Sequence, residues 1–224
     1  MATVVIATAV SMLYITYRHL YPTFSWNQKL TVQLNTPNGE FTGSSVSHIT
    51  WRKGFNLSTD WNHTFEAEAL HIELPDDKHL FALITLPLNQ EYIGTLLPAS
   101  LANKEGRVLD DQLFRFVATE LAPGKPVRVP SYQWPRLVTF EDLRNKDSVH
   151  LIESNDITKV LGKGYSIKSV TIELTGDQPS TNSLRKVLTW LRPEPEPALL
   201  SRLAPTDFSA EANLRHGDFL RKPR

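Results

Sequence analysis

Three serines and a histidine in one short segment carry the functional groups needed for nucleophilic catalysis. They are Ser44, Ser45, Ser47 and His48. A serine nucleophile needs a general base within hydrogen-bond reach and donors that stabilise the oxyanion. These residues instead fall within a predicted strand and lack the strand-turn-helix context of a Gly-x-Ser-x-Gly elbow. We therefore interpret them as polar groups that form hydrogen bonds across a sheet, and we assign no catalytic residue.

Imidazole and carboxylate groups, which bind divalent metals, are concentrated between residues 63 and 73. They are His63, Glu66, Glu68, His71 and Glu73. Residues of a strand advance by about 3.3 Å, so His63 and His71 would lie about 26 Å apart. His71 and Glu73 would point together, about 7 Å apart, and a site would need His48 or His79 from across a hairpin. A half-buried strand face is the favoured interpretation, and we predict no metal or cofactor.

Two further segments resemble functional motifs but favour loops. The sequence Gly162-Lys163-Gly164-Tyr165-Ser166 lacks the spacing of a phosphate-binding loop and precedes a predicted strand, so we expect a turn. An acidic stretch would supply a glycosidase carboxylate pair only in a cleft of defined width, and a solvated loop is favoured. It contains Glu141, Asp142, Asp147, Glu153 and Asp156. Asn56 and Asn62 begin N-glycan acceptor patterns, which have meaning only in a eukaryotic secretory context.

Three aromatic residues surround one predicted loop and are the ligand-binding candidates of this chain. They are Trp51, Phe55 and Trp61. Aromatic rings exposed together on a loop bind the flat faces of sugars or the apolar side chains of a partner protein. The alternative is that the same rings form an edge of the core, where large aromatic side chains are usually buried.

Composition limits the classes of function. The chain has 224 residues, and its 24 basic residues balance its 24 acidic residues, so its net charge is zero. A general nucleic-acid-binding protein needs a basic surface, and we therefore expect no nucleic-acid partner. The sequence contains no cysteine, which excludes disulfides, thiolate metal sites and cysteine nucleophiles.

Hydrophobic periodicity predicts an α+β fold, in which a mainly antiparallel sheet packs against two or three helices. The predicted strands are Lys29–Thr36, Glu40–Lys53, His63–Leu74, Leu80–Leu86, Leu137–Phe140, Ser148–Ile152 and Tyr165–Leu174. The predicted helices are Val108–Leu121, Ile157–Leu161 and one that Thr181 or Asn182 caps and that runs to Leu191. Thr36-Pro37-Asn38-Gly39 predicts the turn of a long hairpin between the first two strands. An extended linker is expected over Pro123–Pro135, because it contains four prolines.

The first seventeen residues carry no charged side chain and predict a membrane segment over residues 1–21, before Pro22 stops the helix. Tyr14, Tyr17, Tyr21, Phe24 and Trp26 are the aromatic residues expected at a membrane interface. An uncleaved single-pass anchor is favoured over a cleaved signal, because no basic residue precedes the apolar run. A helix or strand buried in a soluble protein is the third alternative. Arg18 and Lys29 follow the segment, and by the positive-inside rule they place the domain in the cytoplasm.

We predict three regions: the membrane segment at 1–21, a single α+β domain at 28–191, and a proline-rich spacer with a basic tail at 192–224. Several short phrases resemble an uncharacterised family of bacterial proteins with an N-terminal membrane segment and one domain. They are Thr36-Pro37-Asn38-Gly39-Glu40, Gly43-Ser44-Ser45-Val46, Leu80-Phe81-Ala82-Leu83, Leu137-Val138-Thr139-Phe140, Thr171-Ile172-Glu173-Leu174, Thr189-Trp190-Leu191 and His216-Gly217-Asp218-Phe219.

This resemblance implies an inner-membrane protein whose domain lies outside the cytoplasmic membrane, and it supplies no activity or site residue. The chain departs from the family pattern because it has no basic residue before the apolar run. The favoured function is a non-enzymatic, membrane-anchored envelope protein whose domain binds another envelope protein or a wall component. The alternative is an envelope hydrolase that acts on a glycan or ester with catalytic residues dispersed along the sequence.

Overall fold

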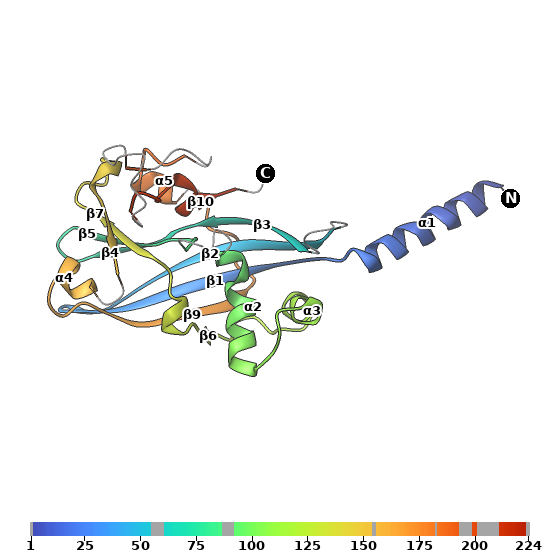
Figure 1. The fold of residues 1–224 in the computed structure, drawn as a ribbon, viewed down its shortest axis with the longest axis horizontal. Helices are drawn as coiled ribbons and strands as arrows, with labels where there is room; N and C mark the ends of the chain where they lie inside the picture. Colours follow the sequence, from blue (N-terminus) through green and yellow to red (C-terminus); the bar gives the residue numbers. More distant parts are fainter. Residues whose placement is uncertain are drawn as a thin grey trace.

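Two antiparallel β-sheets and a few helices form the body of the protein, in agreement with the predicted α+β class. The computed structural model describes residues 2–54, 61–86, 92–153, 156–181, 183–192, 199–200 and 211–222. Helix α1 (Ala2–Leu20) projects from one end of the body, as Figure 1 shows. The sheets, the helices and the C-terminal end of the chain are gathered at the other end of α1.

The larger sheet has six strands in the order β10-β3-β2-β1-β9-β6. Their bounds are β1 (Thr23–Thr36), β2 (Gly39–Lys53), β3 (Trp61–Glu68), β6 (Val127–Arg128), β9 (Ser166–Thr175) and β10 (Leu220–Arg221). The predicted hairpin is confirmed, because β1 and β2 pair from Thr23 opposite Arg52 to Thr36 opposite Gly39. Gly39 closes the turn with a φ of 118°, a conformation that glycine adopts without strain. Alternate side chains of β1 are buried, so one face of this sheet lies on the core.

The smaller sheet has four strands in the order β4-β5-β7-β8. Their bounds are β4 (Leu70–Leu74), β5 (Lys78–Ala82), β7 (Leu137–Phe140) and β8 (Val149–Ile152). The prediction of one strand over His63–Leu74 is wrong, because the chain leaves the larger sheet after Glu68 and enters the smaller one at Leu70. The buried positions change parity at this point, from Phe65 and Ala67 to Leu70 and Ile72. A single strand cannot bury both sets on one face, so the chain changes sheets.

Helices α2 (Tyr92–Glu105) and α3 (Asp111–Thr119) cover the core face of the larger sheet. The side chain of Gln28 on β1 donates to the carbonyl of Ile93 on α2 at 2.5 Å. The predicted helix over Val108–Leu121 is confirmed but shorter, because Asp110 occupies the N-cap and accepts from the amide of Leu113.

Shorter elements fill the connections. Besides the predicted helix α4 (Ile157–Leu161), there are 3₁₀ turns over Ser131–Gln133, Lys146–Ser148 and His216–Asp218. The predicted extended linker carries β6 and the first of these turns within it.

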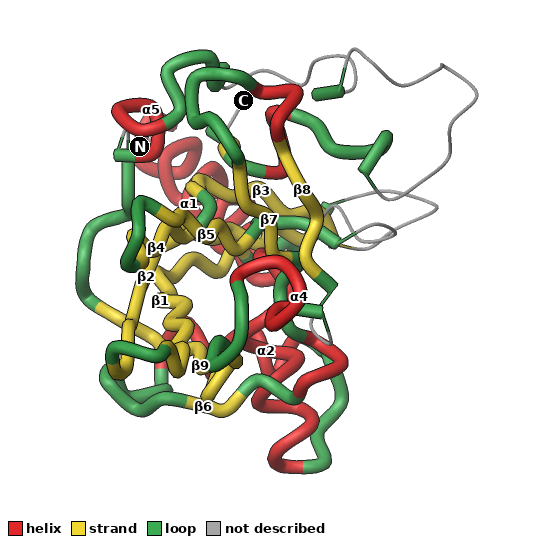
Figure 2. Tube along the Cα trace, turned by 90° about the vertical axis from the view of Figure 1, so that its left-hand side faces the viewer, coloured by secondary structure: helices red, strands yellow, loops and turns green. Residues whose placement is uncertain are grey.

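The end of the chain packs on the outer face of the smaller sheet, on the opposite side of the body from α2 (Figures 1 and 2). We call its described residues, 183–192, 199–200 and 211–222, the C-terminal segment. Helix α5 (Leu184–Val187) is shorter than the helix that was predicted to reach Leu191. The predicted proline-rich spacer at 193–197 lies outside the described residues. The buried apolar residues of this second core are Ala69, Phe81, Leu83, Val138, Phe140, Val149, Leu184, Leu188, Leu191, Leu199, Leu200, Leu214, Phe219 and Leu220.

Helix α1 does not meet the requirements for a membrane span. Nineteen residues at 1.5 Å each extend about 28 Å, and Thr8, Ser11 and Thr16 interrupt the apolar sequence before Arg18. Across the described part of the chain, no helix combines the length and the hydropathy that crossing a membrane takes. The expectation of a single-pass inner-membrane protein with a periplasmic domain is therefore wrong.

Candidate functional site at the base of helix α1

Helix α1 exposes large apolar side chains along its described length, and this is the most unusual surface of the molecule. Ile6, Val10, Leu13 and Tyr17 are 59–70% exposed. Together with Leu20 they recur at intervals of four and three residues, which places them on one side of a helix. Such a surface is normally covered by another apolar phase. We call these five residues the apolar face of α1.

The opposite side of α1 is more polar. Thr8, Ser11, Arg18 and His19 share it with the exposed side chains of Met12 and Ile15. Of the aromatic residues expected at a membrane interface, Tyr14 and Tyr17 are exposed. Phe24 and Trp26 are instead buried in the core of the body. The chain therefore enters the folded body at Pro22, and the two exposed tyrosines belong to α1 itself.

An aromatic stack lies beneath the point where α1 joins the body. The ring of Trp51 is stacked between those of His63 and Phe114, with both ring centroids 4.5 Å away. Its indole nitrogen donates to the carbonyl of Gly94 at 3.2 Å. Trp51 is 8% exposed, so it is a buried member of the core edge. Phe55 lies outside the described residues.

Trp61 forms the outer side of this stack and is half-buried. Its ring lies 5.8 Å from that of Phe24, and its indole nitrogen donates to Asp111 Oδ1 at 2.7 Å. Lys53 Nζ donates to the other carboxylate oxygen of Asp111 at 3.0 Å. Three elements are thereby held together at one place, because Trp61 begins β3, Lys53 ends β2 and Asp111 begins α3. Ligand binding by Trp51, Phe55 and Trp61 stays a prediction.

Basic side chains surround the same junction. Arg18 is exposed on the last turn of α1, and Arg52 is exposed opposite Thr23 on the neighbouring strand. The guanidinium of Arg115 on α3 lies 5.7 Å from the ring centroid of Phe24. Among the described residues, no ion pair joins Arg18, Arg52 or Arg115 to a carboxylate. We call these three arginines the basic collar.

The serine and histidine candidates on β2 do not form a catalytic pair. Ser45 Oγ donates to the carbonyl of Glu68 at 2.7 Å. His48 Nδ1 lies 2.7 Å from Asn27 Oδ1, and its Nε2 lies 3.3 Å from Thr50 Oγ1. The imidazole is therefore bonded to an amide and a threonine hydroxyl, and Ser45 is bonded to the backbone.

The metal-ligand candidates are dispersed, except that His71 lies against His79. Glu68 is buried and accepts from the amides of Ser183 and Leu184 at the start of α5, which anchors the C-terminal segment. His71 Nε2 and His79 Nδ1 lie 2.9 Å apart across β4 and β5. As the side chains lie, no three histidine or acidic residues of the described chain are grouped to hold a metal ion.

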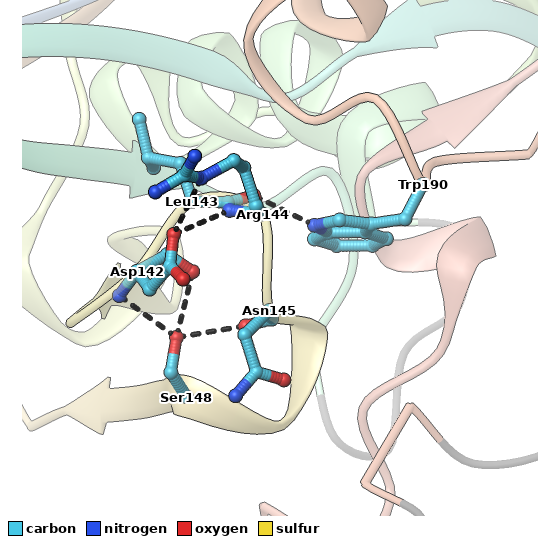
Figure 3. Close-up of polar contacts among 6 residues, drawn as sticks. All are labelled: Asp142, Leu143, Arg144, Asn145, Ser148 and Trp190. Carbon is cyan, nitrogen blue, oxygen red and sulfur yellow. Dashed lines mark hydrogen bonds and ion pairs between the residues drawn. The ribbon is translucent and has the colours of Figure 1, made fainter.

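The acidic stretch and the glycine motif both form connections. Ser148 Oγ donates to the carbonyls of Asp142 and Asn145, and Trp190 Nε1 donates to the carbonyl of Leu143 at 2.9 Å (Figure 3). The turn therefore holds the C-terminal segment against the smaller sheet. Hydrogen bonds from the amide and side chain of Arg144 hold the pKa of the Asp142 carboxyl below its ordinary value. Gly162 and Gly164 have positive φ between α4 and β9, as expected of a turn.

Comparisons with known proteins return nothing: no family model, no curated protein and no solved structure matches this chain. The functional argument therefore depends on the geometry described above. Sequence reasoning identified the apolar residues of α1 and two rings of the aromatic stack. It did not identify the basic collar, because its arginines come from α1, β2 and α3, and a sequence gives no signal that these elements meet.

Proposed function

We propose that this chain is a non-enzymatic interaction protein that the apolar face of α1 attaches to the surface of an anionic lipid bilayer. The observation that carries this proposal is the exposure of Ile6, Val10, Leu13 and Tyr17 on a helix that projects from the body. An interfacial helix lies along the headgroups and buries its apolar side to a depth of about 5–10 Å. The two-sided character of α1 supports this orientation.

The basic collar supports an anionic surface as the partner. Arg18, Arg52 and Arg115 stand around the point where α1 enters the body, with Arg115 on the α3 side of the larger sheet and Arg52 on the other. A bilayer that covers α1 brings its headgroups to the arginines on the side that it faces. Each basic residue near an anionic bilayer contributes about 1 kcal/mol to binding. The body then lies against the surface, where its other faces bind a partner protein.

A second copy of the chain is the competing partner for α1, because intervals of four and three residues also suit a coiled-coil seam. One observation favours lipid: pairing through the apolar face would give the three arginines of the collar no counter-charge.

Vesicle flotation tests the proposal. The full chain is expected to float with phosphatidylglycerol vesicles, and Leu13→Glu is expected to abolish flotation because it places a charge on the apolar face. Val108→Glu is the matched control, since Val108 is 74% exposed and belongs to the connection between α2 and α3. Flotation of the Leu13→Glu variant at the wild-type level would overturn the proposal. So would a wild-type dimer in sedimentation that Leu13→Glu dissociates while neither protein binds vesicles.

The collar is tested separately. Arg52→Gln combined with Arg115→Gln is expected to weaken binding to phosphatidylglycerol vesicles by about fivefold per arginine. Binding to neutral phosphatidylcholine vesicles should not change. Arg144→Gln, which removes an arginine far from the collar, is the control. Equal losses on both vesicle types would show that the collar supports the fold and does not recognise charge.

A further inference from the structure

We propose that His71 and His79 form an acid-sensitive clasp that controls whether the C-terminal segment covers the outer face of the smaller sheet. The proposal is independent of the attachment through α1. It rests on the head-to-head arrangement of the two imidazoles and on the rings that connect them to the end of the chain.

The two imidazoles share one hydrogen bond. His71 Nε2 lies 2.9 Å from His79 Nδ1, and their ring centroids are 5.2 Å apart at an interplanar angle of 22°. The centroid distance equals the nitrogen-to-nitrogen distance plus roughly one ring radius at each end, so the two nitrogens point directly at each other. One nitrogen must donate and the other must accept. When both rings are fully protonated, two donors face each other and this hydrogen bond is lost.

The pair is connected to the C-terminal segment through aromatic rings. His71 stacks on its cross-strand partner Phe81, with centroids 4.7 Å apart at 13°. Phe81 and Phe219 are fully buried, and their centroids lie 6.4 Å apart. Two residues before His71, the amide of Ala69 donates to the carbonyl of Phe219 at 2.7 Å. Separation of the two imidazoles therefore disturbs the ring against which Phe219 packs.

The environment of the pair disfavours charge. Burial is the main cause that lowers the pKa of His71 below its ordinary value of 6.5, and the proximity of His79 lowers it further. Glu73, which lies opposite His79 on the neighbouring strand, opposes this shift. The neutral ring of Phe81 packs on His71, and the neutral rings of Phe140 and Phe219 pack in turn on Phe81.

The sign of the pH effect follows from this shift. In the unfolded chain His71 binds a proton at its ordinary pKa of 6.5, whereas in the folded chain it binds one only at lower pH. The contribution to stability is therefore fully present above that value and is lost progressively as the pH falls below it. The clasp opens when both facing nitrogens carry a proton, because neither can then accept the shared hydrogen bond.

Amide hydrogen exchange at about pH 7.5 and about pH 5, corrected for intrinsic exchange, tests the clasp in the full chain. Protection of residues 214–221 is expected to fall severalfold at the lower pH, because two donors then face each other across the pair. His79→Gln is expected to remove this pH dependence. His150→Gln should retain it, because His150 pairs with Glu141 at 3.1 Å on the exposed side of β8.

Two results would overturn the clasp. One is a wild-type chain whose residues 214–221 keep the same protection at both pH values. The other is a His79→Gln variant that loses protection as the wild type does. Should either histidine variant fail to fold, NMR titration of the wild-type imidazoles decides the matter. The clasp requires that His71 titrates below the ordinary histidine pKa of 6.5, and titration of His71 at or above that value refutes it.

Discussion

The guanidinium of Arg136 lies 3.2 Å from the carboxylate of Asp218, and both side chains are buried. This ion pair joins the residue before β7 to the 3₁₀ turn that precedes β10. Asp218 also accepts a short hydrogen bond from Thr85. Burial lowers the pKa of Arg136, and Asp218 opposes that shift. The pair is thus the main charged contact between the smaller sheet and the C-terminal segment.

Asp218→Asn is expected to lower the free energy of unfolding by about 3–5 kcal/mol, because it leaves the buried charge of Arg136 without its counter-ion. Urea denaturation followed by circular dichroism measures the change. The double variant Arg136→Met with Asp218→Leu should recover much of the loss, since it removes both charges together. Lys168→Gln, which breaks an exposed ion pair with Glu40, serves as the control and should cost at most about 1 kcal/mol. A loss for Asp218→Asn no larger than the control's would contradict the assignment.

Gly43→Ala is expected to destabilise the packing of β2 against β4. A Cβ at this position would lie 2.5 Å from Ile72 Cγ1 and 3.2 Å from the carbonyl oxygen of His71. Overpacking of this kind costs about 1–3 kcal/mol. Gly176→Ala is the matched control, because its Cβ would meet no atom within 4 Å. Equal thermal midpoints for the two variants would contradict this prediction, because β2 and β4 would then accommodate the added methyl group without a loss of stability.

Alkaline pH is expected to destabilise the protein through Tyr92. Its hydroxyl is buried and donates to the carbonyl of Gln133 at 2.9 Å, and burial raises its pKa above the ordinary value of 10. Above that value the unfolded chain loses the phenolic proton while the folded chain keeps it, so stability falls as the pH rises. Denaturation midpoints at several alkaline pH values measure this slope. Tyr92→Phe should flatten it, whereas Tyr132→Phe, at an exposed position, should leave it unchanged.

Local sequence signals predicted the elements whose conformation is determined by residues close to them in the sequence. The hairpin of β1 and β2 follows from strand alternation and an Asn-Gly turn, and β7, β8 and α4 lie where they were expected. Helix α2 was missed for a physical reason. Its buried residues include Tyr92, Leu96, Pro98 and Leu101, so it is covered on several sides and shows little of the apolar-to-polar contrast that reveals a surface helix.

Long-range contacts account for what the sequence could not predict. The outer layer formed by the C-terminal segment depends on Glu68, which accepts a hydrogen bond from the amide before α5. It also depends on the ion pair between Asp218 and Arg136. The candidate site also depends on long-range contacts. Only the folded chain brings together the three elements that supply Trp61, Lys53 and Asp111.

The position of β10 affects how this protein emerges during its synthesis. Leu220 and Arg221 pair with Glu68 and Ala67, which are made long before them. Phe219, directly before β10, closes over Phe81 and Phe140. On the ribosome, these apolar rings and the adjacent edge of β3 therefore remain uncovered until Phe219 and β10 have been synthesised. Nascent chains that stop short of Phe219 present this surface to chaperones, and chains that extend through β10 conceal it.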